Sequence, residues 1–260
     1  MEKEEILLRN RLIELSKIAY QKNIAMFSDF LNINEQNIFH QIPSKELYAT
    51  ARVFGGYQFA ERQMVVFVPE ALFFDDKDLS DNTISIFPIS SLKITPVTPK
   101  YAQTLTHRDY LGAILNLGIE RSKVGDIVIS DNLAYVYVSS KLKDYICSDF
   151  TSVKRTAITV AEISLAEMDY QPKYEEITSS VSSTRLDSMI SSAFHLSRTK
   201  AIPYIELGKV YVNSKLVTSN GHKLKDNDVV SVRGVGKFLY CGIKNTSKKG
   251  RYMIEIHKYV

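Results

Sequence analysis

The stretch that decides the fold of the C-terminal part reads RLDSMISSAFHLSRTKAIPYIELGKVYVN and covers residues 185–213. Its first half carries apolar side chains at the i, i+3, i+4, i+7 and i+8 positions of an amphipathic helix, which we expect to begin at Arg185. Thr184 and Asp187 have the spacing of a capping box, which predicts this start. The apolar face of the helix consists of Leu186, Met189, Ile190, Ala193 and Phe194.

A second helix and a hairpin follow. Ser197 can cap a helix that runs through Leu207, and Gly208 can end it in the left-handed conformation. Alternating apolar residues then predict short strands. These expected strands cover residues 209–213, 216–217 and 228–232.

Residues 185–233 closely resemble the S-four RNA-binding domain, also called the alpha-L motif. The resemblance rests on residues that occur in the family's order: Arg185-Leu186-Asp187, Ser197-Arg198, Ile205, Gly208-Lys209-Val210, Val212-Asn213 and Asp228. One departure is Asn213-Ser214, where family members usually have Asn-Gly. Asn tolerates the left-handed region and Ser does so poorly, so the sequence leaves the type of this turn open.

Basic residues at the two helix starts are the expected RNA contacts. Arg185 and Arg198 lie at the starts of successive helices, and Lys200 lies in the first turn of the second. Exposed amides at a helix N-terminus carry positive partial charge and adjacent cationic side chains add to it, so a phosphate is attracted there. Basic side chains at this end oppose the helix macrodipole, which hints that they serve a ligand. Lys209 and Lys215 would extend the cationic surface.

The charge of the chain is segregated along its length. The formal net charge of +4 hides a balance of 14 Lys+Arg against 5 Asp+Glu in residues 181–260, which is +9, and −5 over the rest. A basic terminal domain on a mildly acidic body is a common footprint of nucleic-acid binding. The charge distribution by itself has a second explanation, which is a lysine-rich surface that interacts only with solvent.

The remainder of the chain predicts an α+β fold with two further domains. Residues 1–78 are expected to form a small α+β domain. It has a helical pattern at 6–18, a second helix or a continuation of the first at 25–31, and a strand-turn-strand pattern over 52–57 and 63–68. Residues 79–172 have the order β-α-β-β-α-β, which is the ferredoxin-like pattern that RNA-recognition (RRM-like) folds use. Its expected elements are 83–97, 106–117, 126–129, 134–138, 140–150 and 152–163, with a turn at Asp131-Asn132. A linker around 172–176 and a Ser- and Thr-rich run lead to the S-four-type domain with its terminal β unit, residues 181–260.

Motifs outside the C-terminal domain narrow the resemblance. Residues 106–113, THRDYLGA, with Gly125-Asp126-Ile127 resemble the middle domain of the YlmH family. Gly55-Gly56-Tyr57 and Ala60-Glu61-Arg62 resemble that family's N-terminal part. The resemblance implies a ribosome-associated quality-control factor that binds a free large subunit with an obstructed nascent chain, and that contacts rRNA and peptidyl-tRNA. His107 and Arg108 are then expected RNA contacts.

The alternative function is an RNA-modifying enzyme, because S-four domains also accompany enzymes. Arg185-Leu186-Asp187 superficially resembles the catalytic segment of some pseudouridine synthases, yet it opens the binding module. We therefore expect Asp187 to be a helix cap or an arginine partner, and the chain not to be an enzyme. His107-Arg108-Asp109 could suggest acid–base chemistry, but adjacent helical residues point in different directions. A third hypothesis is an adaptor that links RNA to division or envelope proteins.

The sequence offers no metal-ligand spacing. His40, His195, His222 and His257 form no such spacing with Cys or carboxylates, so we expect neither a metal site nor a cofactor. The Tyr135-Val136-Tyr137-Val138 strand leaves two readings open, because its aromatic rings could stack on bases or lie in the core.

The charged N-terminus lacks a signal-peptide core, and no run of about 18 apolar residues would span a membrane. We expect a cytoplasmic monomer with rRNA, tRNA and the large ribosomal subunit as partners, and with no membrane partner.

Overall fold

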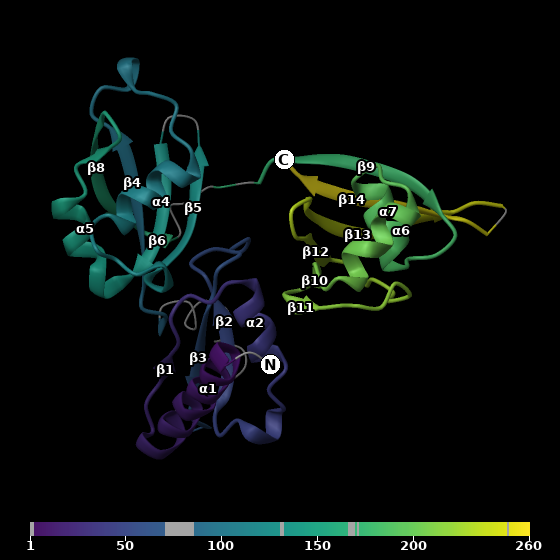
Figure 1. Cartoon of the computed structure of the whole chain (residues 1–260), viewed down its shortest axis with the longest axis horizontal. Coiled ribbons are helices and arrows are strands. Elements are labelled where there is room, and N and C mark those ends of the chain that lie inside the picture. Colours follow the sequence, from purple (N-terminus) through teal and green to yellow (C-terminus); the bar gives the residue numbers. More distant parts are fainter. Residues whose placement is uncertain (1–2, 71–85, 131–132, 166–169, 171, 249) are drawn as a thin grey trace. The chain divides into compact units, whose positions relative to one another are not determined.

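The computed structural model describes residues 3–70, 86–130, 133–165, 170, 172–248 and 250–260. The chain forms two compact units, Met1–Asp169 and Tyr170–Val260 (Figure 1). Both combine helices with sheets, which confirms the predicted α+β class. The division into three domains stays a prediction. Among the described residues, no helix is long and apolar enough to cross a membrane.

The N-terminal unit begins with a three-stranded antiparallel sheet, ordered β1-β3-β2, against which helix α1 packs through Leu12, Leu15 and Ala19. The helix and the two strands expected here are confirmed. The helix expected over residues 25–31 was wrong, because Met26 and Phe27 pair with Phe67 and Val66 as a strand instead. The elements are α1 (Lys3–Lys22), β1 (Met26–Phe27), α2 (Ile33–His40), a 3-10 turn (Ser44–Glu46), β2 (Thr50–Phe54) and β3 (Met64–Val68).

The same unit contains a five-stranded antiparallel sheet in the order β5-β6-β4-β8-β7. Its first four strands and two helices follow the chain order β-α-β-β-α-β, as the ferredoxin-like prediction requires. The elements are β4 (Ile89–Pro96), α4 (His107–Leu115), β5 (Val124–Ser130), β6 (Leu133–Ser139), α5 (Lys143–Asp149), β7 (Ser152–Val153) and β8 (Thr156–Ile163). The 3-10 turns Pro99–Tyr101, Arg121–Lys123 and Ser140–Leu142 accompany them.

Two expected elements of this sheet differ in detail. The last strand is split into β7 and β8, because Lys154 has φ +53 and reverses the chain. The first strand begins at Ile89, after Pro88, and the positions 83–85 assigned to it lie outside the described residues. The Asp131-Asn132 turn also lies outside them.

The position of Tyr137 in strand β6 decides whether its ring is free to stack on bases or lies in the core. Helices α4 and α5 pack on the sheet face that carries Leu92, Ile94 and Val136, and alternation along β6 turns Tyr137 to the other face. There Tyr137 is 0% exposed and stacks on Tyr57, with ring centroids 4.9 Å apart and planes at 9°. Tyr137 is therefore a core residue, whereas Tyr135 is half-buried.

The C-terminal unit has a six-stranded sheet in the order β11-β10-β12-β13-β14-β9, with helices α6 and α7 packed on one face (Figure 1). Its core joins Leu186, Met189 and Ile190 of α6 to Val230, Phe238 and Ile256 of the sheet. The elements are β9 (Tyr174–Val181), α6 (Leu186–Ala193), α7 (Arg198–Glu206), β10 (Val210–Val212), β11 (Lys215–Leu216), β12 (Asp228–Val232), β13 (Gly236–Thr246) and β14 (Tyr252–Tyr259).

Strand β9 corrects the expected linker. Residues 174–181 pair along their whole length with β14, from Tyr174↔Tyr259 to Val181↔Tyr252. Only Ile177 and Val181 of this strand are buried, so its sequence carries a weak hydrophobic alternation. The partner strand is the last in the chain, and local sequence patterns do not reveal such a distant pairing.

Candidate RNA-binding site

The start of helix α6 is built around a buried carboxylate. Arg185 is the N-cap residue, with φ −65° and ψ 142° and no side-chain cap, so the expected Thr184–Asp187 capping box was wrong. Asp187 is 4% exposed and accepts two hydrogen bonds from the Arg185 guanidinium, from Nε to Oδ1 and from Nη2 to Oδ2, both at 3.1 Å. It also accepts the Ser188 amide at 2.8 Å. Asp187 thus acts as the arginine partner that the sequence offered as one option.

Helix α7 brings a second arginine to the same carboxylate. Arg198 is its first residue, and its Nη2 lies 3.6 Å from Asp187 Oδ1. The hydrogen bonds to Asp187 raise the pKa of Arg185. The side chains of Arg185 and Arg198 are 43% and 48% exposed, so about half of each stays open to solvent. Arg185, Asp187 and Arg198 are called the Asp187 cluster below; its formal charge is +1.

The first turn of α7 follows the prediction closely. The Ser197 hydroxyl accepts the Lys200 amide at 3.3 Å and caps the helix, and Gly208, with φ +68, lies just beyond its end. Lys200 is exposed in this first turn. The cap uses one amide of the helix start, and the macrodipole still favours an anion at this end.

Two lysines flank the first hairpin strand. Lys209 is exposed just before β10, with its ammonium 5.9 Å from the centroid of the Tyr204 ring, and Lys215 is exposed at the start of β11. Between the strands, Asn213 and Ser214 have φ +49 and +63, the signs of a type I′ turn, which resolves the open question about this turn.

Asn213 is held in this conformation from both sides. Its Nδ2 donates to Asp228 Oδ1 at 2.8 Å, and its Oδ1 accepts the Val229 amide at 2.9 Å.

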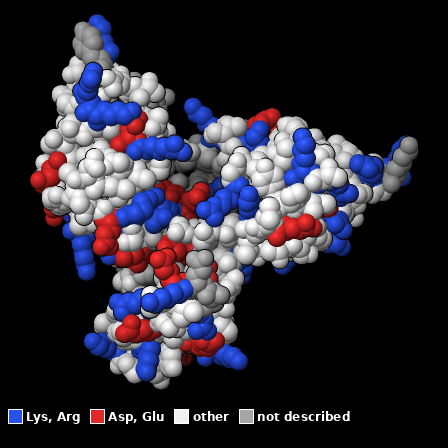
Figure 2. Space-filling view, viewed as in Figure 1, with Lys and Arg blue, Asp and Glu red and all other residues white. Residues whose placement is uncertain are grey.

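Figure 2 shows Lys and Arg side chains spread over the visible face of the C-terminal unit, with fewer acidic ones among them.

His107 and Arg108 belong to the N-terminal unit, where they are the exposed first residues of α4. Their neighbour Asp109 accepts a hydrogen bond from the Thr106 amide at 2.9 Å and forms an ion pair with the Lys154 ammonium at 2.7 Å. Desolvation and the nearby Arg121 guanidinium lower the pKa of His107, which favours a neutral imidazole at pH 7. Because the Asp109 carboxylate accepts the Thr106 amide and pairs with Lys154, it serves as a helix cap.

Three of the family-like motifs of the N-terminal unit, GGY, AER and GDI, meet at Asp126, a role that the sequence alone did not reveal. Its carboxylate accepts the Tyr57 hydroxyl at 3.0 Å and the amides of Glu61 and Arg62 at 2.6 and 3.0 Å. The Arg62 guanidinium donates to the backbone carbonyls of Val124 and Phe30 at 3.0 and 2.9 Å. We call these contacts the Asp126 junction.

Glycines make the Asp126 junction possible. Gly56 has φ +103, and a Cβ added there would lie 2.2 Å from the Tyr137 ring. A Cβ on Gly125 would lie 2.7 Å from the ring of Phe30. The motifs GGY, AER and GDI are therefore explained by packing inside the N-terminal unit.

Three side chains that share no sequence motif also gather in the C-terminal unit. Cys241, Glu255 and His257 each direct a potential ligand atom to one place, and these atoms lie within 4.8 Å of one another. The residues are far apart or alternate in sequence, so the pairing of β13 with β14 creates the group.

The chain is similar to two domain families, to a bacterial protein and to a solved structure. The family described as the putative RNA-binding domain in YlmH matches residues 85–177, and the S4 domain matches residues 184–230. The ribosome-associated protein quality control protein P2 of Bacillus subtilis (strain 168) is 26% identical over 260 residues, covering 98% of this chain and 96% of that protein. A solved structure described as cell division protein ylmH from Streptococcus pneumoniae has a TM-score of 0.49 and 18% identity, covering 64% of this chain and 95% of that one. Two domain matches in this order, and a relative that aligns along nearly the whole chain, support the assignment of the chain to the YlmH family.

Proposed function

We propose that this protein is a non-enzymatic RNA-binding factor that docks on the large ribosomal subunit and contacts rRNA and peptidyl-tRNA in the quality control of stalled nascent chains. The S4 match and the match to a putative RNA-binding domain support RNA as the ligand. The name of the Bacillus subtilis relative supports a ribosome-associated role.

The Asp187 cluster is the observation that carries this proposal. A guanidinium can pair with a phosphate through two parallel hydrogen bonds, and the geometry is most favourable when the arginine is already oriented. Asp187 orients two arginines from successive helix starts while leaving each about half exposed. The resulting surface suits two neighbouring phosphates of a folded RNA.

The remaining contacts extend this surface. Lys200, Lys209 and Lys215 add charge around α7 and the first hairpin, and phosphate contacts of this kind give affinity and position rather than sequence specificity. His107 and Arg108 are proposed as a second contact region on the N-terminal unit.

The same geometry argues for binding without chemistry. The oxygens of Asp187 face two guanidinium groups and a backbone amide, which leaves this carboxylate poorly placed to remove a proton from a substrate. Asp109 serves as a helix cap. Neither carboxylate therefore supports the RNA-modifying alternative.

The test is co-sedimentation of the purified protein with large ribosomal subunits. Arg198→Ala and Arg185→Ala should each weaken binding by about 1–3 kcal/mol, roughly 5- to 150-fold, if each arginine makes a good phosphate contact. Arg11→Ala removes the same charge from an exposed site in helix α1, outside both domain matches, and is the matched control. Unchanged binding by both cluster variants, with normal circular dichroism, would contradict the proposal. Crosslinking to rRNA and tRNA on the sedimented particle then tests which RNA is touched.

A further inference from the structure

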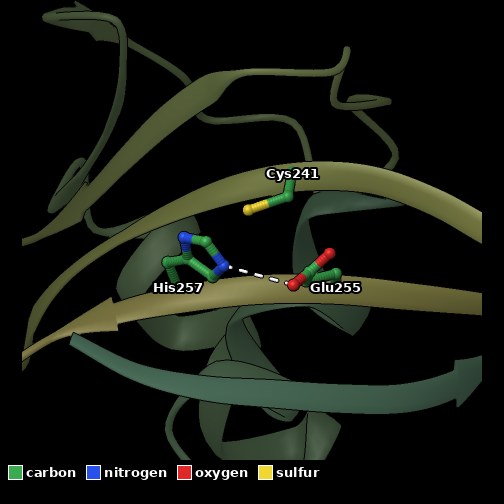
Figure 3. A group of neighbouring side chains, drawn as sticks. All are labelled: Cys241, Glu255 and His257. Carbon is green, nitrogen blue, oxygen red and sulfur yellow. Dashed lines mark hydrogen bonds and ion pairs between the residues drawn. The ribbon is translucent and has the colours of Figure 1, made fainter.

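Strands β13 and β14 bring a thiol, a carboxylate and an imidazole together on one face of the C-terminal sheet (Figure 3). Tyr240 pairs with Ile256 and Gly242 pairs with Glu255, so Cys241 is the extra residue of a β-bulge. Bulges re-aim side chains. Here the thiol lies across from Glu255 and His257, and all three residues are half-buried.

Neighbouring side chains orient two of these groups. The His257 ring stacks on Tyr174, with centroids 4.2 Å apart and planes at 5°, and its Nε2 lies 3.2 Å from Glu255 Oε1. The other carboxylate oxygen, Oε2, accepts from the Lys244 ammonium at 2.9 Å. A hydrogen bond to the outer oxygen of a ligating carboxylate is common in known metal sites, and Lys244 supplies such a bond to Glu255 here.

We propose that Cys241, Glu255 and His257 form a zinc-binding site. Zn²⁺ binds thiolate sulfur at about 2.3 Å and imidazole nitrogen or carboxylate oxygen at about 2.0–2.2 Å in tetrahedral geometry, so its ligand atoms lie roughly 3.2–3.7 Å apart. The separation of 3.2 Å between His257 Nε2 and Glu255 Oε1 already fits. The Cys241 sulfur lies within 4.8 Å of both, so it has to move closer to them to complete the set.

The donor types select the metal. A thiolate with an imidazole favours zinc over magnesium or calcium, which prefer oxygen ligands. Binding releases the thiol proton of Cys241 to solvent, replaces the contact between His257 Nε2 and Glu255 Oε1, and requires the neutral His257 ring to carry its proton on Nδ1; a water takes the fourth position. The ion would tie β13 to β14, the strand that also holds β9, and would thereby stabilise the sheet. This inference is independent of the proposed RNA binding.

The experiment uses the full-length protein, with Zn²⁺ as the probe and Co²⁺ as its spectroscopic substitute. Cys147 and Cys241 are the two cysteines of the chain, both free, so Cys147→Ser gives a background in which Cys241 is the single thiol. In this background we expect one zinc per chain by elemental mass spectrometry, and zinc should protect the thiol from a disulfide reagent. Co²⁺ should give the sulfur-to-metal charge-transfer absorption that a thiolate ligand produces.

Variants then assign the ligands. In the wild-type background, Cys241→Ser should weaken zinc binding by more than the roughly 10- to 100-fold that outer-shell substitutions cost, and so should His257→Gln in the Cys147→Ser background. His222→Gln, in the same unit, should have no effect. Circular dichroism in the presence of a chelator shows whether each variant folds. Absence of stoichiometric zinc in the parent protein, or an unprotected Cys241 thiol at saturating zinc, would overturn the proposal whatever the variants do.

Discussion

Arg62 in the N-terminal unit and Arg198 in the C-terminal unit both lie near an aspartate, but their guanidinium groups have different surroundings. Arg62 donates to the backbone carbonyls of Val124 and Phe30, and its own amide donates to Asp126. Arg198 lies 3.6 Å from Asp187 and is 48% exposed. The guanidinium of Arg62 is largely used inside the unit, whereas that of Arg198 keeps donors open to solvent.

The difference distinguishes a structural arginine, Arg62, from an arginine that we propose to bind RNA, Arg198. Desolvation by the surrounding protein lowers the pKa of Arg62, as expected for a guanidinium enclosed by backbone. In the Asp187 cluster, the carboxylate is the enclosed partner and the arginines face outward. A family motif that contains arginine can therefore mark either a packing junction or a ligand surface.

The largest effect is expected for Asp126→Ala. This change removes the acceptor of three hydrogen bonds, from Tyr57, Glu61 and Arg62, and should lower the free energy of unfolding by about 2–4 kcal/mol. Urea unfolding measures the loss, with the exposed Asp144→Ala as control. Binding of the folded protein to large subunits should stay unchanged. A stable variant with impaired binding would instead make the Asp126 junction part of the ligand surface.

Conservative exchanges should separate the two arginines next. Arg62→Lys should cost roughly 1–3 kcal/mol of stability, because one ammonium cannot satisfy the three carbonyls that the guanidinium joins. Arg198→Lys should leave stability unchanged and weaken subunit binding less than Arg198→Ala does, since a point charge remains. Thermal unfolding and co-sedimentation of both variants provide the comparison. Equal stability losses in the two would remove the distinction.

Salt dependence gives a smaller but specific signature. Each phosphate contact contributes about 0.7–0.9 to the slope of log affinity against log salt concentration. Arg198→Ala should reduce the slope by about this amount, and Arg62→Lys should not change it. Affinities of the wild type and both variants for large subunits, measured across a salt series, give these slopes. An unchanged slope in Arg198→Ala would mean that this arginine does not neutralise a phosphate.

The smallest effect concerns Asp109 in the N-terminal unit. The hydrogen bond from Lys154, followed by those from Thr106, lowers the pKa of Asp109 from 3.8 to about 2. Because the folded-state pKa is depressed, the stabilisation is present above about pH 4 and is lost as the pH falls towards 2. Wild type should exceed Asp109→Asn in stability at pH 7, and this difference should shrink below pH 4. A difference that is constant with pH would contradict the linkage.

Local sequence signals predicted the C-terminal helices well. The apolar spacing around Leu186 and Met189, the Ser197 cap and Gly208 are effects of neighbouring residues, and the structure contains them all. The capping box at Thr184 failed because the Asp187 carboxylate binds Arg185 and the Ser188 amide instead. A spacing pattern cannot show which of several nearby donors a carboxylate accepts from.

The other wrong predictions concern strand pairings between segments that are distant in the sequence. Residues 25–31 have the apolar content of a helix, yet Met26 and Phe27 pair with β3. Residues 174–181 have the composition of a linker, yet they pair with the last strand of the chain. In both cases the free energy of sheet formation outweighs weak local propensity.

The sequence by itself determined the α+β class, the β-α-β-β-α-β order, the S4-like helix pair and the concentration of positive charge in residues 181–260. Periodicity, caps and charge are properties of short segments, so they can be read without coordinates. Only the tertiary structure decided that Asp187 orients two arginines, that Tyr137 is buried against Tyr57, and that Cys241 meets His257. These contacts depend on strand register and helix packing, which bring together residues that are separated in the chain.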